Sequence, residues 1–432
     1  MKTVKAVQEN GRPTLPSELH APWPDVSAGT RGAEFLRITF PVLDGGQWTV
    51  APIHLTSLLR AVRDRYGNGV QTLVFSSKDL DWALAYARRV GASGAIHHAY
   101  PTRWTVDWAK SWLSRRLRQY DAVVQDLLEA HGVDVALCKQ LLRGYGRVGT
   151  MWWVTDFQHL SMPEMFNEAE REERTASFLR SSSFATRIIL ISDAVRQDFV
   201  KFAPSYAAKA RVLQPVSLVP DRIYTVDSRT AVSRYELPEK FIYLPNQFWK
   251  HKNHELVFRA VKVLRDRGVH VRVVCTGNLI DYRHPVHSAE LFRNLSAWGL
   301  REHVICLGLV PHEHVLLLMR QSVCVLNPAL FEGWGYSVDE ARSLGKRVVL
   351  SDIPAHREQN PPNAVFFQPH DVEDLADRLR EVWLDQPAGP DPRLEEVARL
   401  ELQRRRRAYA EQFVALAREA ARAAADEARS WA

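Results

Sequence analysis

Two carboxylates on either side of a glycine-containing turn form the part of this sequence best suited to chemistry. Glu332 and Glu340 have seven residues between them, and Gly333 and Gly335 let a ligand approach the backbone closely. The apolar run 322–326 predicts a buried strand before the turn, and 337–344 predicts a short helix with Ser337 at its N-cap. Free N–H groups at a helix start attract anions, most often phosphate. Backbone amides that bind phosphate, beside carboxylates that accept hydrogen bonds from hydroxyls, suit a nucleotide-sugar.

The spacing of these residues also fits an ordinary strand–turn–helix unit with acidic residues near the helix start. A longer set of motifs favours the functional interpretation. Residues 243–367 resemble the donor half of family 4 retaining glycosyltransferases, which have the GT-B fold. The matches, in chain order, are Lys252-Asn253, Gly308-Leu309-Val310, Glu332-Gly-Trp-Gly-Tyr-Ser-Val-Asp-Glu340, which is similar to the family's E-G-F-G-x-x-x-x-E signature, and Ser351-Asp352-Ile353-Pro354.

This resemblance implies an α/β protein with two Rossmann-like, doubly wound domains that face each other across a cleft. It implies transfer of a hexose from a nucleotide diphosphate sugar to a hydroxyl of a glycan or lipid-linked acceptor, with retention at the anomeric carbon. Family analogy favours bacterial surface polysaccharide or lipopolysaccharide synthesis and a mannose-like donor, carried by GDP, UDP or dTDP. The departing phosphate would take the acceptor proton, so neither a metal nor another cofactor is required.

The resemblance also assigns roles to single residues. Glu332 would bind the transferred sugar, Glu340 the donor ribose, and the loop at Leu309 and Val310 the base. The diphosphate would be held by Lys252, by Lys250, and by the backbone of Gly333, Trp334, Gly335, Tyr336 and Ser337. The sequence departs from the family at Asn246-Gln247, where Gly-Arg is usual, so the phosphate-binding arginine is missing. The alternative for the two lysines is a solvated loop.

The N-terminal half shows the same alternation of apolar runs and helical stretches. A strand at 35–40, a turn with Gly45 and Gly46, and a helix at 54–65 open a predicted α/β domain. Further apolar runs predict a mostly parallel sheet; they lie at 71–75, 133–138, 151–154 and 187–191. In the resembled family the glycine turn lies near the donor phosphates and the acceptor; a simple tight turn is the alternative.

A polar cluster follows the apolar strand at 151–154, where open α/β sheets bind their ligands. The segment from Trp152 to Pro163 resembles the D-x-Q-H…P-x-F segment of some family 4 enzymes that build bacterial polysaccharides. By position, Asp156 and His159 would face the sugar and the acceptor, where an imidazole could bind a hydroxyl or help to move the acceptor proton. The alternative is an aspartate that caps a turn and a histidine bonded to backbone.

An aromatic and basic stretch between residues 103 and 120 has two predicted faces. Trp104, Trp108 and Trp112 recur every four residues, with Arg115 and Arg118 on or beside that face. Aliphatic residues, including Leu113 and Leu117, form a second face that is expected to pack in the core. Five basic residues and one acid between 103 and 118 give a net charge of +4, so the tryptophan face suits peripheral contact with an anionic membrane. Packing within the protein is the alternative.

Composition sets the remaining bounds. The 432 residues have 46% hydrophobic and 25% charged content, as in a soluble globular protein of two domains. Neither a signal peptide nor an 18-residue apolar stretch is found. The four cysteines predict buried thiols in a reducing environment. The expected location of the protein is therefore the cytoplasm, either free or peripheral at the inner face of the membrane. The net charge of +7 is modest, and the arginine-rich patches are interpreted as solvated faces rather than a nucleic-acid site. Asp79 and Asp81 are expected to start a helix rather than to bind metal.

The expected organisation is an acceptor-side domain over 1–225, a linker over 226–240, a nucleotide-sugar domain over 241–392 and a helical segment over 393–432. In the resembled fold that last segment crosses back to the first domain. Two other functions stay open: a nucleotide-sugar epimerase or phosphorylase-like enzyme of the same fold, and a catalytically silent, membrane-associated protein that binds sugar nucleotides.

Overall fold

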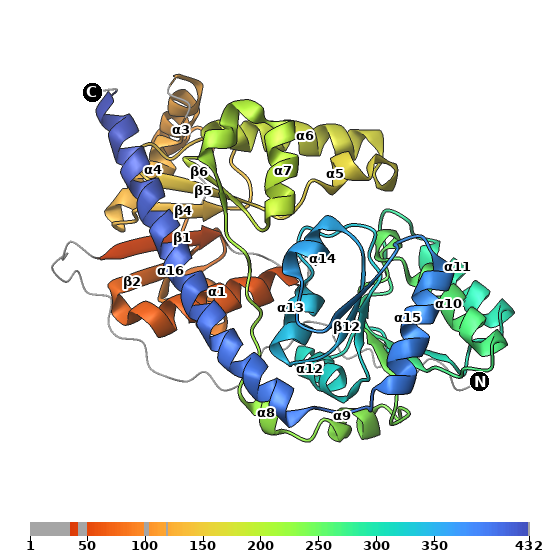
Figure 1. Cartoon of the computed structure of the whole chain (residues 1–432). Coiled ribbons are helices and arrows are strands. Elements are labelled where there is room, and N and C mark those ends of the chain that lie inside the picture. The colour runs from red at the N-terminus through yellow and green to blue at the C-terminus, as the bar shows by residue number, and fades with distance from the viewer. Residues whose placement is uncertain (1–34, 42–49, 99–102, 118–119, 431–432) are drawn as a thin grey trace. The chain divides into compact units, whose positions relative to one another are not determined.

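The computed structural model describes residues 35–41, 50–98, 103–117 and 120–430 (Figure 1). Gly45, Gly46 and Arg118, which the sequence singled out, lie outside the described residues. The chain divides into two compact units. The C-terminal unit comprises Gln158–Phe166 and Ser217–Gln403, and the N-terminal unit comprises the described residues of 35–157 together with 167–216 and 404–430.

The N-terminal unit is built on seven parallel strands in the order β3-β2-β1-β4-β5-β6-β7. Its central strands are buried on both faces, as expected for a parallel sheet covered by helices. The strands are β1 (Leu36–Pro41), β2 (Val70–Ser76), β3 (Gly94–His97), β4 (Val135–Cys138), β5 (Gly149–Val154), β6 (Arg187–Leu190) and β7 (Ala210–Val212). The helices are α1 (Val50–Tyr66), α2 (Leu80–Val90), α3 (Val106–Leu117), α4 (Ala122–Ala130), α6 (Glu168–Phe184) and α7 (Asp193–Phe202).

The C-terminal unit has a six-stranded parallel sheet with the order β10-β9-β8-β11-β12-β13. Phe248, Phe258 and Phe367 belong to the buried core packed against this sheet. The strands are β8 (Ile242–Leu244), β9 (Val273–Cys275), β10 (Val304–Cys306), β11 (Val325–Asn327), β12 (Val348–Ser351) and β13 (Ala364–Phe367). The helices are α5 (Gln158–Ser161), α8 (Arg222–Thr225), α9 (Arg229–Arg234), α10 (His254–Asp266), α11 (His287–Ala297), α12 (His312–Gln321), α13 (Tyr336–Ser343), α14 (Pro354–Gln359) and α15 (Val372–Asp385).

Both sheets are doubly wound, so the predicted fold class is confirmed. In each, the winding reverses beside the first strand, between β1 and β4 in one sheet and between β8 and β11 in the other. Open α/β sheets bind their ligands at this switch point, outside the carboxyl ends of the strands.

The last helix, α16 (Pro392–Ser430), has 39 residues, and its first residues belong to the C-terminal unit while those from 404 on belong to the N-terminal unit. There Phe413 is fully buried and lies 6.1 Å from Phe40 of β1 between ring centroids. Gly149 opens β5 beside this helix, and a Cβ atom at Gly149 would lie 2.8 Å from the Ala420 backbone. The close approach of α16 to β5 therefore requires glycine at this position.

Two local expectations differ from the structure. The segment 226–240, expected to be a linker, contains α9 and belongs to the C-terminal unit. The aliphatic face of α3 was expected in the core, but Leu113 and Leu117 are 49% and 70% exposed. Ser111 and Ser114 are buried instead. Their hydroxyls bond to Asp121 and to the Ala122 amide at 2.8 and 3.0 Å, which lets α3 pack closely on the start of α4.

Asp79 starts a helix, as the sequence predicted. Its carboxylate accepts a hydrogen bond from the Trp82 amide at 2.9 Å and caps α2.

Candidate functional site

Two asparagines meet at the switch point of the C-terminal sheet. Asn327 ends β11, and Asn246 comes two residues after β8, its neighbour in the sheet. Both side chains are buried, and the Asn246 Nδ2 donates to the Asn327 Oδ1 at 3.0 Å. Asn246 thus lies at the switch point of this sheet. Asn327 was not singled out from the sequence. A polar residue that ends an apolar strand before the glycine turn was the available signal.

Ser337 lies against both asparagines rather than at a helix cap. Its Oγ is 3.3 Å from the Asn327 Nδ2 and 3.4 Å from the Asn246 Oδ1. The predicted N-cap at Ser337 is therefore wrong: α13 starts at Tyr336 with Gly335 at the N-cap and no side-chain capping bond. The Ser337 hydroxyl contacts two residues outside its helix instead of capping the helix backbone, because tertiary packing often overrides local propensity.

Glu332 and Lys252 form an ion pair at this site. The Lys252 Nζ lies 2.6 Å from the Glu332 Oε1, which also accepts a hydrogen bond from the Asn327 Nδ2 at 3.2 Å. Their side chains are 11% and 18% exposed, so solvent screens the pair only in part. The sequence assigned these residues to different parts of the donor, whereas the structure brings them into direct contact.

Lys252 is held in place by an unusual backbone conformation next to it. Asn253 follows the short 3₁₀ turn Lys250–Lys252 with a φ of 58°, in the left-handed region. Its Nδ2 donates to the carbonyls of Pro328 and Pro369 at 3.2 and 3.0 Å. The Lys-Asn motif thus joins the lysine loop to the loop after β11. Lys250 is exposed, and its amide donates to the Asp281 carboxylate at 3.0 Å.

Glu340, on the second turn of α13, pairs with His312 at the start of α12. The His312 Nε2 and the Glu340 Oε1 are 2.6 Å apart. Burial alone would lower the pKa of His312, but the charge and the hydrogen bond of Glu340 outweigh it, so the pKa lies above its usual value. His312 was not predicted as a functional residue, because its 28-residue separation from Glu340 leaves no local signal.

Some backbone amides of the turn already have partners. The Gly335 amide donates to the Gln359 Oε1 at 3.2 Å, and the Gln359 Nε2 donates back to the Gly335 carbonyl at 3.0 Å. A Cβ atom at Gly335 would lie 2.8 Å from that Oε1, so a larger residue would displace the Gln359 side chain from these two hydrogen bonds. The motif at 351–354 leads into α14, which carries Gln359. Among the predicted phosphate ligands, the Gly335 N–H is thus occupied, while the Ser337 N–H lies in the first turn of α13, where amides lack intrahelical partners.

Trp334 is buried within the same turn. Its side chain is 6% exposed, and its indole N–H has no hydrogen-bond partner among the described residues. Tyr336, two residues later, is half-buried at the first position of α13. Leu309 and Val310, the predicted base-pocket residues, follow β10; Leu309 is 54% exposed and Val310 half-buried.

Asp156 and His159 are placed in different units. Asp156 follows β5 in the N-terminal unit and pairs with Arg174 of α6 at 2.8 Å, with both side chains 26% exposed. His159 lies in α5 of the C-terminal unit, where it is 1% exposed, with its ring centroid 6.4 Å from that of Phe166. Arg174 was missed by sequence reasoning, since nothing in the spacing links it to Asp156.

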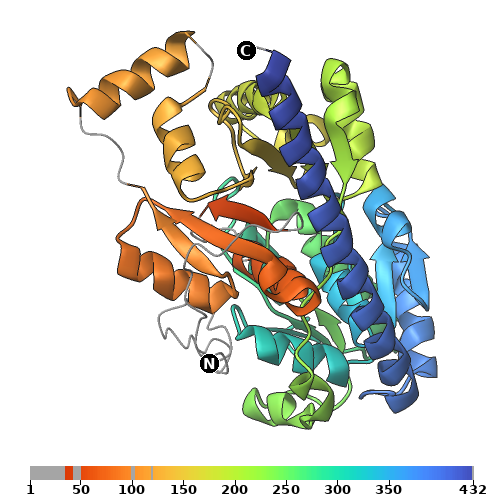
Figure 2. The ribbon, with the colours of Figure 1, turned by 90° about the vertical axis from the view of Figure 1, so that its left-hand side faces the viewer.

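The aromatic and basic surface of α3 is exposed. Trp104 precedes the helix and is 78% exposed, Trp112 is 49% exposed, and Trp108 is half-buried with its ring centroid 5.3 Å from that of Trp104. Arg115 lies 3.6 Å from Asp121, and Figure 2 shows α3 (upper orange helix) at the periphery of its unit. Within the part of the chain that the structure describes, no helix is long and apolar enough to cross a bilayer.

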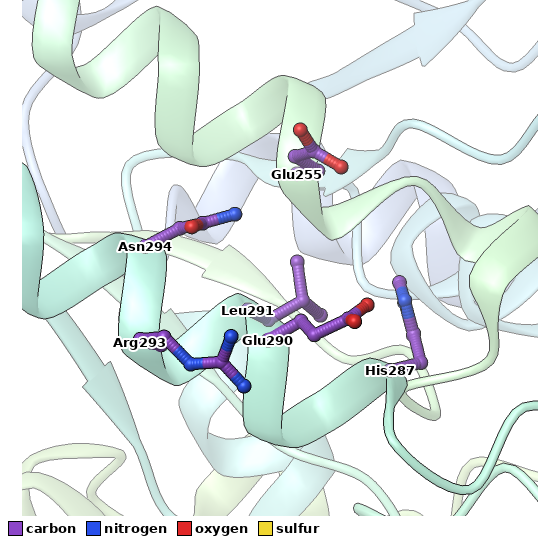
Figure 3. A pocket seen from close by; sticks show the side chains of 6 residues that line it. All are labelled: Glu255, His287, Glu290, Leu291, Arg293 and Asn294. Carbon is purple, nitrogen blue, oxygen red and sulfur yellow. The ribbon is translucent and has the colours of Figure 1, made fainter.

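A cavity of about 230 Å³ lies between α10 and α11 (Figure 3). Its lining is mostly polar and comes from Glu255, His287, Glu290, Leu291, Arg293 and Asn294. None of these residues belongs to the predicted site. The described residues contain no group of three or more His, Cys, Asp or Glu side chains that could hold a metal ion.

Comparisons with known proteins bear on the family and the fold of the chain. Residues 229–409 match the family described as Glycosyl transferases group 1. The chain is 24% identical over 209 residues to the serotype-specific mannosyltransferase WbdA of Escherichia coli, an alignment that covers 47% of this chain and 25% of WbdA. It is 20% identical over 230 residues to the O-antigen chain mannosyltransferase RfbU of Salmonella typhimurium, covering 52% of this chain and 63% of RfbU. The chain thus spans only a quarter of the length of WbdA.

Among solved structures, the chain is similar to HepE of Anabaena in complex with UDP, with a TM-score of 0.63 and 16% identity over 88% of this chain and 98% of that one. These findings, together with the two doubly wound sheets, give the chain the GT-B fold and assign residues 229–409 to a glycosyl transferases group 1 domain.

Proposed function

We propose that the protein is a retaining glycosyltransferase of family 4, which moves a hexose from a nucleotide diphosphate sugar to a hydroxyl of a glycan or lipid-linked acceptor. The observation that carries the proposal is the buried network at the switch point of the C-terminal sheet. There Asn246, Asn327 and Ser337 connect to the Glu332–Lys252 pair, beside the start of α13. A site for a sugar diphosphate needs groups that accept hydrogen bonds from the sugar hydroxyls. It also needs a cation and a helix start to bind the phosphates.

The Glu332–Lys252 pair suits the two sides of the donor bond that breaks, which joins the sugar to the phosphate. Glu332 would accept hydrogen bonds from the sugar hydroxyls, while Lys252 would turn toward the phosphate as negative charge develops on it. Asn327 keeps the Glu332 carboxylate hydrogen-bonded during this exchange. Lys250, exposed and two residues away, supplies a second cation in place of the arginine that the family usually has.

Retention would follow from attack on the same face of the sugar that the phosphate leaves, with the phosphate taking the acceptor proton. This route needs orientation and charge stabilisation more than a strong base. Glu340 would bind the donor ribose, and Leu309 and Val310 the base, while Asp156 and His159 would serve the acceptor side. The names of WbdA and RfbU support mannose and surface polysaccharide, and the UDP complex of HepE supports a nucleotide. The base stays open among GDP, UDP and dTDP.

The test is release of nucleoside diphosphate from GDP-, UDP- and dTDP-sugars, with and without an oligosaccharide or lipid-linked acceptor. A transferase releases the diphosphate in proportion to glycosylated acceptor, with the anomeric configuration kept in the product. An epimerase would convert the sugar without release, and a phosphorylase would require inorganic phosphate. Binding of the donor with no turnover for any acceptor would instead favour a silent binding protein.

We also propose that α3 contacts the anionic inner face of the cytoplasmic membrane. The exposed apolar residues of α3 (Val106, Trp112, Leu113 and Leu117) and Trp104, which precedes it, lie among arginines and a lysine. The exposure of Leu113 and Leu117, which the sequence had placed in the core, enlarges the apolar surface. Aromatic and aliphatic side chains beside cations favour the headgroup layer of anionic lipid.

Sedimentation with vesicles tests this contact. Binding to anionic vesicles, and not to zwitterionic ones, is expected to fall when Trp112 and Leu117 are both changed to Ser. The matched control changes Val397 and Leu400 of α16 to Ser; these are 62% and 50% exposed and should not matter. Equal vesicle binding by both double variants would contradict the proposal.

A further inference from the structure

The Glu340–His312 contact has a feature that helix packing does not require. Glu340 is 8% exposed, and its Oε1 lies 2.6 Å from the His312 Nε2. No other side chain among the described residues donates a hydrogen bond to this carboxylate. Burial of a carboxylate costs free energy unless it is hydrogen-bonded. His312 therefore both compensates the burial of Glu340 and leaves its second oxygen for another donor.

The neighbours of His312 are already engaged elsewhere. Glu313 pairs with Arg222 at 3.0 Å, and the His314 Nδ1 lies 2.7 Å from the Tyr235 hydroxyl. Tyr243, whose environment includes the Glu340 charge, has its own hydroxyl 2.6 Å from that of Thr276. The first turn of α12 thus contains two histidines, one bonded to a tyrosine and one to the carboxylate of the proposed site.

We propose that His312 is a positioning residue that orients the Glu340 carboxylate, so that its Oε2 accepts a ribose hydroxyl of the nucleotide. This rests on the proposed function, in which Glu340 binds the donor ribose. The imidazole fixes the rotation of the carboxylate by holding Oε1, and it keeps the negative charge in place before the nucleotide arrives. The charge and the hydrogen bond of Glu340 raise the pKa of His312, which favours a positively charged imidazole beside the carboxylate.

A carboxylate that is held in advance gives the site a preference for ribose over its deoxy forms. A hydrogen bond to a charged group contributes enough to make that preference about tenfold or more. Loss of the positioning contact should reduce this preference selectively, because a misplaced carboxylate no longer distinguishes a nucleotide with the hydroxyl from one without it. A purely structural histidine would change stability or overall affinity and leave the preference unchanged.

The experiment measures binding of UDP, GDP and their 2′-deoxy and 3′-deoxy forms by calorimetry. The full-length protein should bind a ribose nucleotide at least about tenfold more tightly than one of its deoxy forms. His312→Phe, which removes the donor but keeps a ring, should bring this ratio close to one. His312→Gln, which keeps an N–H donor, should restore most of it. His314→Phe is the matched control, with the same change on the same helix turn, and should keep the ratio of the unmodified protein.

Glu340→Gln separates this inference from the proposed function. If Glu340→Gln loses the preference and His312→Phe keeps it, the positioning role is overturned while the ribose site stands. If Glu340→Gln also keeps the preference, or if the unmodified protein binds neither these nucleotides nor dTDP, the proposed function fails together with the inference. Should His312→Phe not fold, as judged by its unfolding transition, His312→Ala replaces it in the same comparison.

Discussion

The two sheets share one winding order but differ in the residues that come after the strands at their switch points. In the C-terminal sheet, Asn246 and Asn327 are buried and connect to Glu332 and Ser337. In the N-terminal sheet, β4 at the switch point ends at Cys138, and its neighbour β5 ends at Val154, two residues before the more exposed Asp156–Arg174 pair. The winding determines where strand ends meet, whereas the polar side chains at those ends determine which ligands can be bound there.

The polar groups of this network in the C-terminal sheet are also largely hydrogen-bonded to one another. Each polar group of the Asn327 side chain has a partner: Nδ2 donates to Glu332 and lies near Ser337, and Oδ1 accepts from Asn246 and from the Ala329 amide. Such satisfied networks fix side-chain positions in a low-dielectric environment. The C-terminal unit therefore offers a preorganised site, and the N-terminal unit a more solvated one. Four experiments would test this contrast, in decreasing order of the change that we expect.

Glu332→Gln should have the largest effect, since it removes the charge at the centre of the network. We expect turnover to fall at least about a hundredfold, as when one preorganised group that stabilises a transition state is removed. The measurement is the kcat for diphosphate release under saturating donor and acceptor, with circular dichroism to verify the fold. Glu302→Gln, at an exposed position of the same unit, should leave kcat unchanged. Near-normal turnover of Glu332→Gln would remove Glu332 from the site.

Acid should destabilise both units through one buried histidine in each. Burial lowers the pKa of His54 from 6.5 to about 3. Burial is also the main cause that lowers the pKa of His254 from 6.5 to about 3. Between these values the unfolded chain binds more protons, so stability falls as the pH drops from about 6.5 toward 3. The loss approaches about 1.4 kcal/mol per pH unit for each histidine.

Urea denaturation at several pH values between 7 and 4.5 measures this loss. His54→Phe and His254→Phe should each flatten the dependence of the unfolding free energy on pH, one for each unit. His97→Phe, at an exposed position, serves as the control. A slope that neither buried-site variant changes would show that other groups cause the acid sensitivity.

Lys252→Met should weaken nucleoside diphosphate binding about tenfold, which corresponds to one charge-assisted hydrogen bond to phosphate. The apolar stem of methionine keeps most of the packing, and Glu332 stays hydrogen-bonded to Asn327. Calorimetry with the nucleotide that the protein prefers measures the change. Lys262→Met, which breaks an exposed pair with Asp266, is the control. Unchanged affinity of Lys252→Met would refute a role for this cation.

Asp156→Asn should have the smallest effect, with kcat/KM for the acceptor reduced about tenfold or less, because the pair with Arg174 is already partly solvated. The KM for the donor should stay unchanged. An effect as large as that of Glu332→Gln would erase the contrast between the two sheets and place the chemistry equally on both.

Most of the sheet architecture could be predicted because fully buried parallel strands leave continuous apolar runs. β3 was missed, since Gly94–His97 is four residues long and carries a glycine and a histidine. The face of α3 was assigned wrongly, because spacing shows which apolar residues align but not whether another element covers them. Ser111 and Ser114, with no hydrophobic signal, form the packed face.

The site was predictable only where its residues are close in the sequence. The turn from Glu332 to Glu340 could be identified from its glycines and acids, but its partners could not. Lys252 is 80 residues from Glu332, and Gln359 is 24 residues from Gly335. Ser337 shows the same limit, since tertiary partners replaced the expected cap. Contacts of this kind depend on the winding of the sheet, which no local pattern encodes.

The position of the terminal helix α16 depends on Gly149, because this residue has no Cβ atom where the helix packs on β5. A Cβ atom there would meet the Ala420 backbone, so any larger residue would lift this part of the helix from β5 or shift the strand. Variation at this one position should therefore be accompanied by a displaced or shortened end of the chain in related proteins, even where every residue of α16 itself is kept.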